Sequence, residues 1–206
     1  MEPNVELVIA SDAETREAVY RFRQGLARDH ALPVDLLPGD YQVNARGGLQ
    51  DLLDPFAIVA AAIDRSSGQM VGAIRTNYLR DGGIPLYPEL YAFGELPGST
   101  VMSSSVTTCR VLTPPHAYGA SGSLRDPALL LAWTLYDIAL NQRICHDFLD
   151  CADDEVPFFS WIGYRLVREI NHPVRGRCNL MRLDVYDWPY LAEIKSPFLT
   201  LARGVA

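Results

Sequence analysis

Hydrophobic and polar positions follow two different periods near the start of the chain. Residues 5–10 (VELVIA) are mostly apolar and β-prone, which predicts a short strand. Apolar residues then recur every three or four positions to about Asp29, as expected for an amphipathic helix with one face in the core. Ser11 and Glu14 have the spacing of a capping box, in which both side chains bind free backbone N–H groups. We therefore predict a strand followed by a helix that begins at this box.

The pattern changes after this helix. Residues 31–48 contain prolines and glycines but few periodic apolar positions, which predicts a long loop. Residues 55–64 and 69–79 are strand-like and are separated by the turn-forming sequence RSSG, which predicts a β-hairpin. The aromatic and proline-rich segment 84–99 shows no regular period.

The second half of the chain predicts four strands and two helices. These elements are a strand from Thr100, a helix from about Arg125 to Arg143, a strand at 147–152, a short helix ended by Gly163, and strands at 164–170 and 179–185. The longer helix is apolar almost all round, so we expect it to be buried on most sides. This order of elements predicts a single α/β domain over residues 1–206, with a mixed central sheet of about seven strands flanked by helices.

Composition and charge limit the classes of protein to which the chain can belong. With 49% hydrophobic and 21% charged residues, the 206-residue chain resembles an ordinary globular domain. Its longest apolar run, Phe56 to Ile63, is too short to cross a bilayer, and the first residues lack a signal-peptide pattern. A net charge of −7 argues against general nucleic-acid binding, which needs a basic surface. We therefore expect a cytoplasmic protein with no membrane span and no nucleic-acid partner.

The cysteines do not predict a metal centre. Cys109, Cys145, Cys151 and Cys178 lie far apart without a C-x-x-C pair, and no two histidines have the spacing of metal ligands. We expect reduced thiols and neither a metal site nor a disulfide framework.

The segment 105–122 (SVTTCRVLTPPHAYGASG) begins as a strand and continues into a glycine-containing loop ahead of a helix. Such a junction presents backbone amides to an anion, and the helix dipole adds a favourable field. We expect this loop to hold the phosphate of a donor molecule through Tyr118, Gly119, Ala120, Ser121, Gly122 and Ser123. The alternative is an ordinary turn that contains glycines for backbone reasons.

Four segments, in order, resemble the GNAT acyltransferase superfamily, and within it the acyl-homoserine-lactone synthases and N-acyl amino acid synthases. The first, 19–30 (VYRFRQGLARDH), is similar to the first helix of these enzymes, with Arg23 at the basic position. The second, 51–79, is similar to their block D-x-x-D, strand, turn, V-G-x-x-R, which places Asp51, Asp54 and Arg75.

The other two segments lie in the second half. VTTCRVL resembles the E-x-S-R-x-x-V strand of the synthases, which places Arg110 at the arginine and Val111 beside it. FFSWIGYRLV resembles the L-G-F step from helix to strand, with Gly163 and Tyr164. The resemblance departs at one position that carries chemistry: Thr107 stands where the synthases have a glutamate that is proposed as general base. The phosphate loop is also altered, since it reads H-x-x-G-x-S from His116.

The resemblance implies transfer of an acyl group from a thioester to an amine, with Arg110, Thr107 and Asp54 as catalytic residues and Val111 in the donor site. Because Thr107 cannot act as a carboxylate base, the amine proton would pass to a water held by Thr107 and Ser103–Ser105, or to Asp54.

Arginine is costly to bury without a carboxylate partner, so we expect Arg23, Arg75 and Arg110 to form a network with Asp51 and Asp54. If this network lines a cleft, Arg23, Asp51 and Arg75 would bind the acceptor, since a guanidinium matches a carboxylate. The alternative places the arginines half exposed at the rim of the sheet.

Two further features concern the donor. The basic residues Arg165, Arg168, Arg175 and Arg177 stand against one glutamate in 165–177, and they could steer an acidic acyl carrier protein; a strand edge protected by charge is the alternative. Six aromatic residues near the long helix could line an acyl tunnel or form ordinary core: Trp133, Tyr136, Phe148, Phe158, Phe159 and Trp161.

The sequence therefore favours an N-acyltransferase with no permanently bound cofactor. Its co-substrate would be an acyl thioester of acyl carrier protein or coenzyme A, and its acceptor an amino acid, a peptide or a related small molecule. A second hypothesis is a catalytically degenerate GNAT-like module that binds an acyl ligand or a partner protein. A third is a hydrolase with Cys109 as nucleophile, although a thiol on a buried strand is more often core packing.

Overall fold

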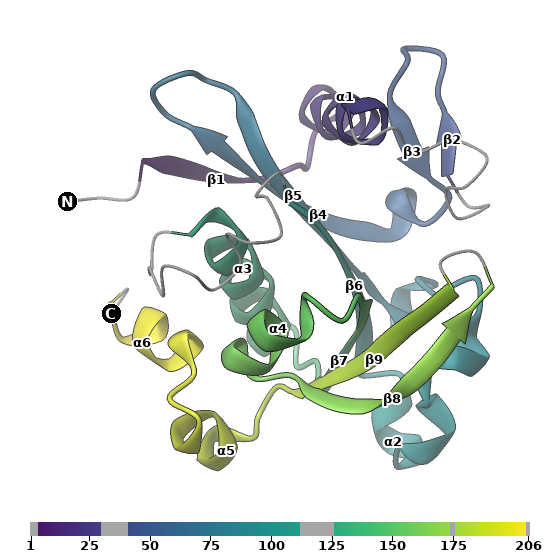
Figure 1. The fold of residues 1–206 in the computed structure, drawn as a ribbon, viewed down its shortest axis with the longest axis vertical. Coiled ribbons are helices and arrows are strands. Elements are labelled where there is room, and N and C mark those ends of the chain that lie inside the picture. Colours follow the sequence, from purple (N-terminus) through teal and green to yellow (C-terminus); the bar gives the residue numbers. More distant parts are fainter. Residues whose placement is uncertain (1–3, 30–40, 112–125, 174–175, 205–206) are drawn as a thin grey trace.

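The computed structural model describes residues 4–29, 41–111, 126–173 and 176–204, and their strands form one mixed seven-stranded sheet in the order β1-β4-β5-β6-β7-β9-β8 (Figure 1). The strands are β1 (Val5–Ile9), β4 (Ala57–Asp64), β5 (Met70–Tyr78), β6 (Ser104–Val111), β7 (His146–Cys151), β8 (Arg165–His172) and β9 (Gly176–Asp184). All neighbouring pairs are antiparallel except β6 and β7, which run parallel. The predicted α/β class with a mixed sheet of about seven strands is confirmed.

Helices cover both faces of this sheet (Figure 1). One face carries α1 (Ala13–Asp29) and a small hairpin of β2 (Tyr41–Val43) and β3 (Leu49–Asp51), and the other carries α3 (Pro127–Asn141), α4 (Val156–Ile162) and α6 (Pro197–Gly204). The shorter helices are η2 (Asp54–Phe56), η3 (Leu79–Asp81), η4 (Pro88–Tyr91), η5 (Phe93–Glu95), α2 (Gly98–Val101) and α5 (Trp188–Glu193). Within the described ranges, no helix has the length and apolar character needed to span a membrane.

The central strands are buried on both faces because each face has its own core. In β4, Ala60 packs in the cluster that contains Leu131 of α3, whereas its neighbour Val59 packs in the cluster that contains Val19 of α1. Alternate residues thus enter different cores, which explains why 57–63 reads as a continuous apolar run instead of an alternating one. The apolar helix α3 is buried as predicted.

Local polar contacts correct two of the predictions. The carboxylate of Asp12, and not the Ser11 capping box, accepts hydrogen bonds from the backbone N–H groups of Glu14 and Thr15 at the start of α1. Part of the predicted loop 31–48 is the β2–β3 hairpin, whose turn is closed by the Asn44 side chain. Residues 31–40 of that loop lie outside the described residues.

The two C-terminal helices were not predicted, although their starts can be read from the sequence. Asp187 caps α5 by accepting a hydrogen bond from the N–H of Tyr190, and Pro189 occupies the first turn. Similarly, Ser196 precedes Pro197 at the start of α6. Both helices are so short that hydrophobic periodicity gives no signal in them.

The sheet opens between β6 and β7. These strands are paired only over Ser104–Val106 and His146–Phe148. Beyond Val106, β6 continues to Val111 with β5 as its partner, while β7 continues to Cys151 with β9 as its partner. In the described part of the sheet, the last residues of β6 therefore have a strand partner on one side only.

Gly163 ends α4 in a backbone conformation that favours glycine, and it packs closely against Leu183 and Leu191. Its φ is +132°, and a Cβ there would lie 2.5 Å from Leu191 Cδ2 and 3.1 Å from Leu183 Cδ1. We predict that Gly163→Ala lowers the free energy of unfolding by about 2–5 kcal/mol, since both backbone strain and overpacking oppose it. Urea denaturation measures this change.

The control is the same substitution at Gly25, an open position of α1 where nothing lies within 4 Å of a new Cβ. Gly25→Ala should stabilise the protein by about 0.5–1 kcal/mol, because alanine favours the helix. Equal effects of the two substitutions would contradict the packing described for Gly163.

Candidate active site

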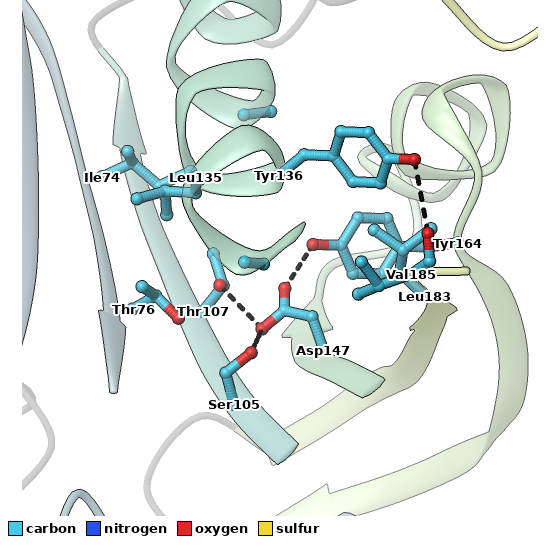
Figure 2. A pocket seen from close by; sticks show the side chains of 12 residues that line it. Ile74, Thr76, Ser105, Thr107, Leu135, Tyr136, Asp147, Tyr164, Leu183 and Val185 are labelled. Carbon is cyan, nitrogen blue, oxygen red and sulfur yellow. Dashed lines mark hydrogen bonds between the residues drawn. The ribbon is translucent and has the colours of Figure 1, made fainter. Parts of the chain in front are cut away.

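A buried carboxylate lies at the point where β6 and β7 part. Asp147 of β7 is opposite Ser105 of β6, and its side chain accepts hydrogen bonds from the hydroxyl groups of Ser105, Thr107 and Tyr164 (Figure 2). The distance from Thr107 Oγ1 to Asp147 Oδ1 is 3.0 Å. Strand β6 and the turn after α4 thus bring three hydroxyl donors to the single carboxylate on β7.

Burial and hydrogen bonding act in opposite directions on this carboxylate. Burial raises the pKa of Asp147 above its usual value, and the hydrogen bonds from Ser105, Tyr164 and Thr107 oppose that rise only in part. A carboxylate with a raised pKa accepts a proton more readily than an exposed one. Asp147 is therefore suited to proton transfer.

A small void adjoins the Asp147 cluster. It offers about 10 Å³ for the centre of a water molecule, and its lining includes Asp147, Thr107 and Thr76 next to apolar residues of α3 such as Leu135 (Figure 2). This is close to the least space that holds one ordered water. The cluster therefore has room for a proton carrier beside it.

Tyr78 adds a second unusual group near Asp147. Its hydroxyl is buried and has no hydrogen-bond partner among the described residues. Burial, together with the charge of Asp147, raises the pKa of Tyr78. Tyr78 is opposite Ser105 in the β5–β6 pair, so both side chains belong to the face of the sheet that α3 covers.

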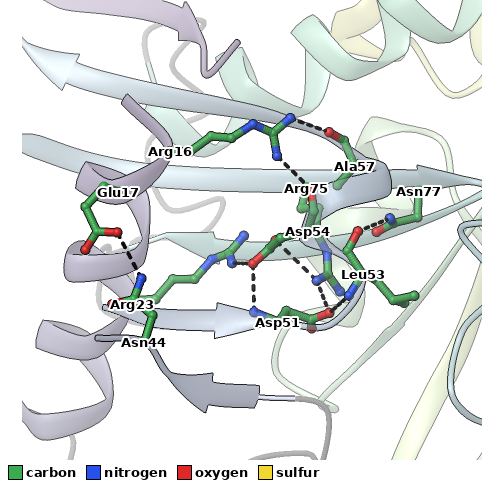
Figure 3. Close-up of polar contacts among 10 residues, drawn as sticks. All are labelled: Arg16, Glu17, Arg23, Asn44, Asp51, Leu53, Asp54, Ala57, Arg75 and Asn77. Atoms are coloured by element: carbon green, nitrogen blue, oxygen red, sulfur yellow. Dashed lines mark hydrogen bonds and ion pairs between the residues drawn. The ribbon is translucent and has the colours of Figure 1, made fainter. Parts of the chain in front are cut away.

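The predicted network of arginines and aspartates forms on the opposite face (Figure 3). Arg23 contacts Asp54 at 2.7 Å, and Arg75 contacts Asp51 at 2.6 Å and Asp54 at 3.5 Å. These side chains are at most 6% exposed. Burial alone would lower the pKa of Arg75, but nearby Tyr41, Asp51 and Asp54 raise it above its usual value. The prediction of a buried network is confirmed for Arg23 and Arg75, and the alternative of half-exposed arginines at the rim is wrong for both. The side chain of Arg110 lies outside what the structure describes.

The structure does not bring Asp54 to Thr107. Arg75 and Thr76 are neighbours in β5 and point to opposite faces, Arg75 to the charged network and Thr76 to the void beside Thr107. Both oxygens of Asp54 are occupied, because Asp54 also accepts a hydrogen bond from the backbone N–H of Asp51. Asp54 therefore holds the network together and has no free oxygen for a substrate proton.

The predicted catalytic residue Arg110 and the predicted donor-site residues are described only in part. Arg110 and Val111 lie in β6, with their backbones opposite Ala73 and Gly72 of β5. The predicted phosphate-loop residues, Tyr118, Gly119, Ala120, Ser121, Gly122 and Ser123, lie outside the described residues. The donor site therefore remains a prediction.

The basic segment is balanced by acidic partners from other elements. Arg165 forms ion pairs with Asp184 at 3.0 Å and Asp187 at 2.7 Å, and its guanidinium lies 3.6 Å from the ring centroid of Tyr190. The other described arginines are also paired: Arg168 with Glu95, and Arg177 with Glu169. Arg175 lies outside the described residues. The positive charge that stands out in the sequence is thus largely neutralised in space.

The described aromatic residues, Cys151 and Cys178 behave mainly as core, whereas the side chain of Cys109 lies outside what the structure describes. Phe148, Phe158 and Phe159 are at most 4% exposed within packed clusters, and Tyr136 is the member of this group that lines the void. Burial raises the pKa of the Cys151 thiol to about 12, so this thiol is not an activated nucleophile. In the described part of the chain, no group of three or more His, Cys, Asp or Glu side chains could hold a metal ion.

Asp147 was missed at the sequence level, although one signal pointed to it. In the strand 147–152 (DFLDCA), Asp147, Leu149 and Cys151 are two residues apart, so their side chains point to the same face of the sheet. All three share the buried face that α3 covers. A charged residue at such an inward position needs partners and is a candidate for function.

Comparisons with known proteins identify the fold. No family model matches the sequence, and no curated protein matches it. Among solved structures, BjaI with MTA, a CoA-dependent acyl-homoserine lactone synthase, has a TM-score of 0.61 at 14% identity, covering 94% of this chain and 90% of BjaI. FeeM, an N-acyl amino acid synthase from uncultured soil microbes, has a TM-score of 0.57 at 16% identity, covering 93% and 99%. At these identities the likeness shows a shared, GNAT-like fold.

The charged network predicts a large effect on stability. We expect Asp54→Asn to lower the free energy of unfolding by about 3–5 kcal/mol, because it leaves Arg23 and Arg75 buried with too little opposite charge. The control Asp137→Asn changes an exposed carboxylate of α3 and should stay within about 0.5 kcal/mol of the wild type. A loss below about 1 kcal/mol for Asp54→Asn, measured by urea denaturation, would contradict the network.

Asp147 predicts a pH dependence of stability. Because its folded-state pKa is raised, the folded protein binds more protons than the unfolded chain between the two pKa values, and stability falls as pH rises through that window. The asparagine variant has no titrating group at this position, so it lacks this pH-dependent loss of stability. The free energy of unfolding of Asp147→Asn, minus that of the wild type, should therefore increase as the pH rises above the ordinary aspartate pKa of about 4. A constant or decreasing difference in denaturation experiments would show that the carboxylate is not destabilised by burial.

Proposed function

We propose that this chain, whose fold is GNAT-like, is an N-acyltransferase that moves an acyl group from a thioester to an amine. The support from comparison is the fold shared with proteins described as acyl-homoserine lactone synthases and an N-acyl amino acid synthase. One of these structures, BjaI, was solved with SAM and isopentyl-CoA.

The observation that carries this proposal is the opening between β6 and β7 with a buried carboxylate at its edge. Attack of an amine on a thioester places negative charge on the carbonyl oxygen, which a backbone N–H can stabilise. The part of β6 beyond Val106 has backbone groups on its β7 side that pair with no described strand. The amine must also lose a proton, for which the opening offers hydroxyl and carboxylate groups.

The two faces of the sheet serve different purposes in this proposal. The charges of Arg23, Asp51, Asp54 and Arg75 already satisfy one another, so the network shapes the acceptor side instead of contacting the acceptor directly. Arg110 is assigned to catalysis, and Val111 and the 118–123 loop are assigned to the donor, as the sequence predicts. Docking of an acidic carrier protein on Arg165 and Arg168 would require these side chains to exchange their present acidic partners.

Acyl transfer can be tested by mass spectrometry. The protein would be incubated with acyl-CoA or acyl carrier protein, loaded with chains from acetyl to palmitoyl, together with pooled amino acids and S-adenosylmethionine. We expect a new N-acyl product and release of the free thiol, and comparison of the two donors identifies the carrier. Parallel reactions without amine measure simple hydrolysis.

Two outcomes would contradict the proposal. Thioester cleavage at equal rates with and without amine would favour a hydrolase. Binding of the donor with no consumption of donor or amine would favour the degenerate binding module.

A further inference from the structure

We propose that Thr107 and Asp147 act as a two-residue proton relay that replaces a carboxylate at position 107. In this relay, the Thr107 hydroxyl accepts a proton from the incoming ammonium group while it passes its own proton to Asp147. The inference rests on the proposed N-acyltransferase function and deepens it, because it names the group that takes the proton.

The first support is position. Thr107 is the first residue of β6 beyond the last pair with β7, so it stands at the edge of the opening. Asp147 is one hydrogen bond further back, at 3.0 Å from the Thr107 hydroxyl, and it belongs to the other strand of the parting pair. We therefore infer that a proton entering from the opening reaches the hydroxyl before the carboxylate; Figure 2 shows the hydrogen bond that joins the two groups.

The second support is the direction of the hydrogen bonds. An ionised carboxylate only accepts, so Ser105, Thr107 and Tyr164 all donate to Asp147. Each hydroxyl then keeps oxygen lone pairs, and those of Thr107 can accept a proton from a substrate at the opening. Ser105 and Tyr164 keep the carboxylate in place while Thr107 transfers the proton.

The third support is the surroundings of the pair. Asp147 is buried, and none of the basic residues that the structure describes forms an ion pair with it. This distinguishes it from Asp54, whose charge is balanced by two guanidinium groups. The void of about 10 Å³ beside Asp147 can hold one water molecule that carries the proton onward.

The transfer balances as follows. One proton of the ammonium group passes through Thr107 to Asp147, which leaves a neutral amine with a free electron pair. That pair forms the C–N bond, the C–S bond breaks, and the departing thiolate takes the second proton that the nitrogen releases. Asp147 then returns its proton to water, so the net products are an amide, a thiol and one proton.

The test compares single substitutions in the full-length protein, with kcat/KM for acyl transfer measured across pH. Near neutral pH, Asp147→Asn should lower kcat/KM by about 100-fold or more, because general base catalysis is worth that much. The wild-type rise with pH should be replaced by one that follows deprotonation of the acceptor amine itself. Thr107→Val, which is nearly isosteric but lacks the hydroxyl, should lower kcat/KM by a similar factor. Thr107→Ser should recover most of what Thr107→Val loses. The matched control is Asp150→Asn, the same change in β7 at a residue that bonds Tyr91, which should have little effect.

A second acceptor separates proton transfer from a structural role. Methoxyamine is unprotonated at neutral pH and needs no base before it attacks. The defects of Asp147→Asn and Thr107→Val should therefore shrink to less than about 10-fold with methoxyamine as acceptor. Thermal unfolding of each variant shows whether it is folded.

The outcomes distinguish the relay from the function on which it rests. Absence of acyl transfer by the wild-type protein with every donor and amine would contradict the proposed function itself. Transfer by the wild type, with an equal loss for both acceptors in folded Asp147→Asn, would show that Asp147 is structural and would overturn the relay. A wild-type pH profile in folded Asp147→Asn would overturn it as well.

Discussion

The two halves of the sheet are joined by the parallel pair β6–β7, which is hydrogen-bonded only over Ser104–Val106 and His146–Phe148. Parallel strands need a crossover connection, and here α3 lies between them in the chain and packs against β4 and β5. The β6–β7 pair therefore has few interstrand hydrogen bonds, but apolar side chains of α3 cover this part of the sheet. The opening, the hydroxyl cluster and the proposed chemistry all depend on this arrangement.

Polar groups are buried on both faces of the sheet, and each face stabilises them differently. On the α1 face, Arg23 and Arg75 balance Asp51 and Asp54, so the network is neutral overall. On the α3 face, Asp147 has hydroxyl donors but no described cationic partner. A buried charge without a counter-charge changes its protonation state more easily. The first arrangement favours rigidity, and the second favours reactivity.

Sequence periodicity predicted most of the fold, since changes between helical and strand periods mark the elements clearly. The charged network was also predictable, because a buried guanidinium requires a carboxylate and D-x-x-D supplied two. The inward position of Asp147 could be read from the strand pattern, but its hydroxyl partners could not, because they depend on the register of β6 against β7, and no turn fixes that register. Likewise, the sequence could not show that Arg75 and Thr76 contribute to different sites until the faces of β5 were known.

The contrast between Arg75 and its neighbour Thr76 also bears on folding fidelity. If β5 slipped by one residue against its neighbours, the guanidinium would enter the apolar side beneath α3 and lose both aspartates. An uncompensated buried charge is far less tolerable than a loosely packed methyl group. The network therefore excludes misaligned sheets more strongly than the alanine-rich strand β4 could. An alanine-rich centre, which would otherwise allow several alignments of similar energy, is in this way limited to one.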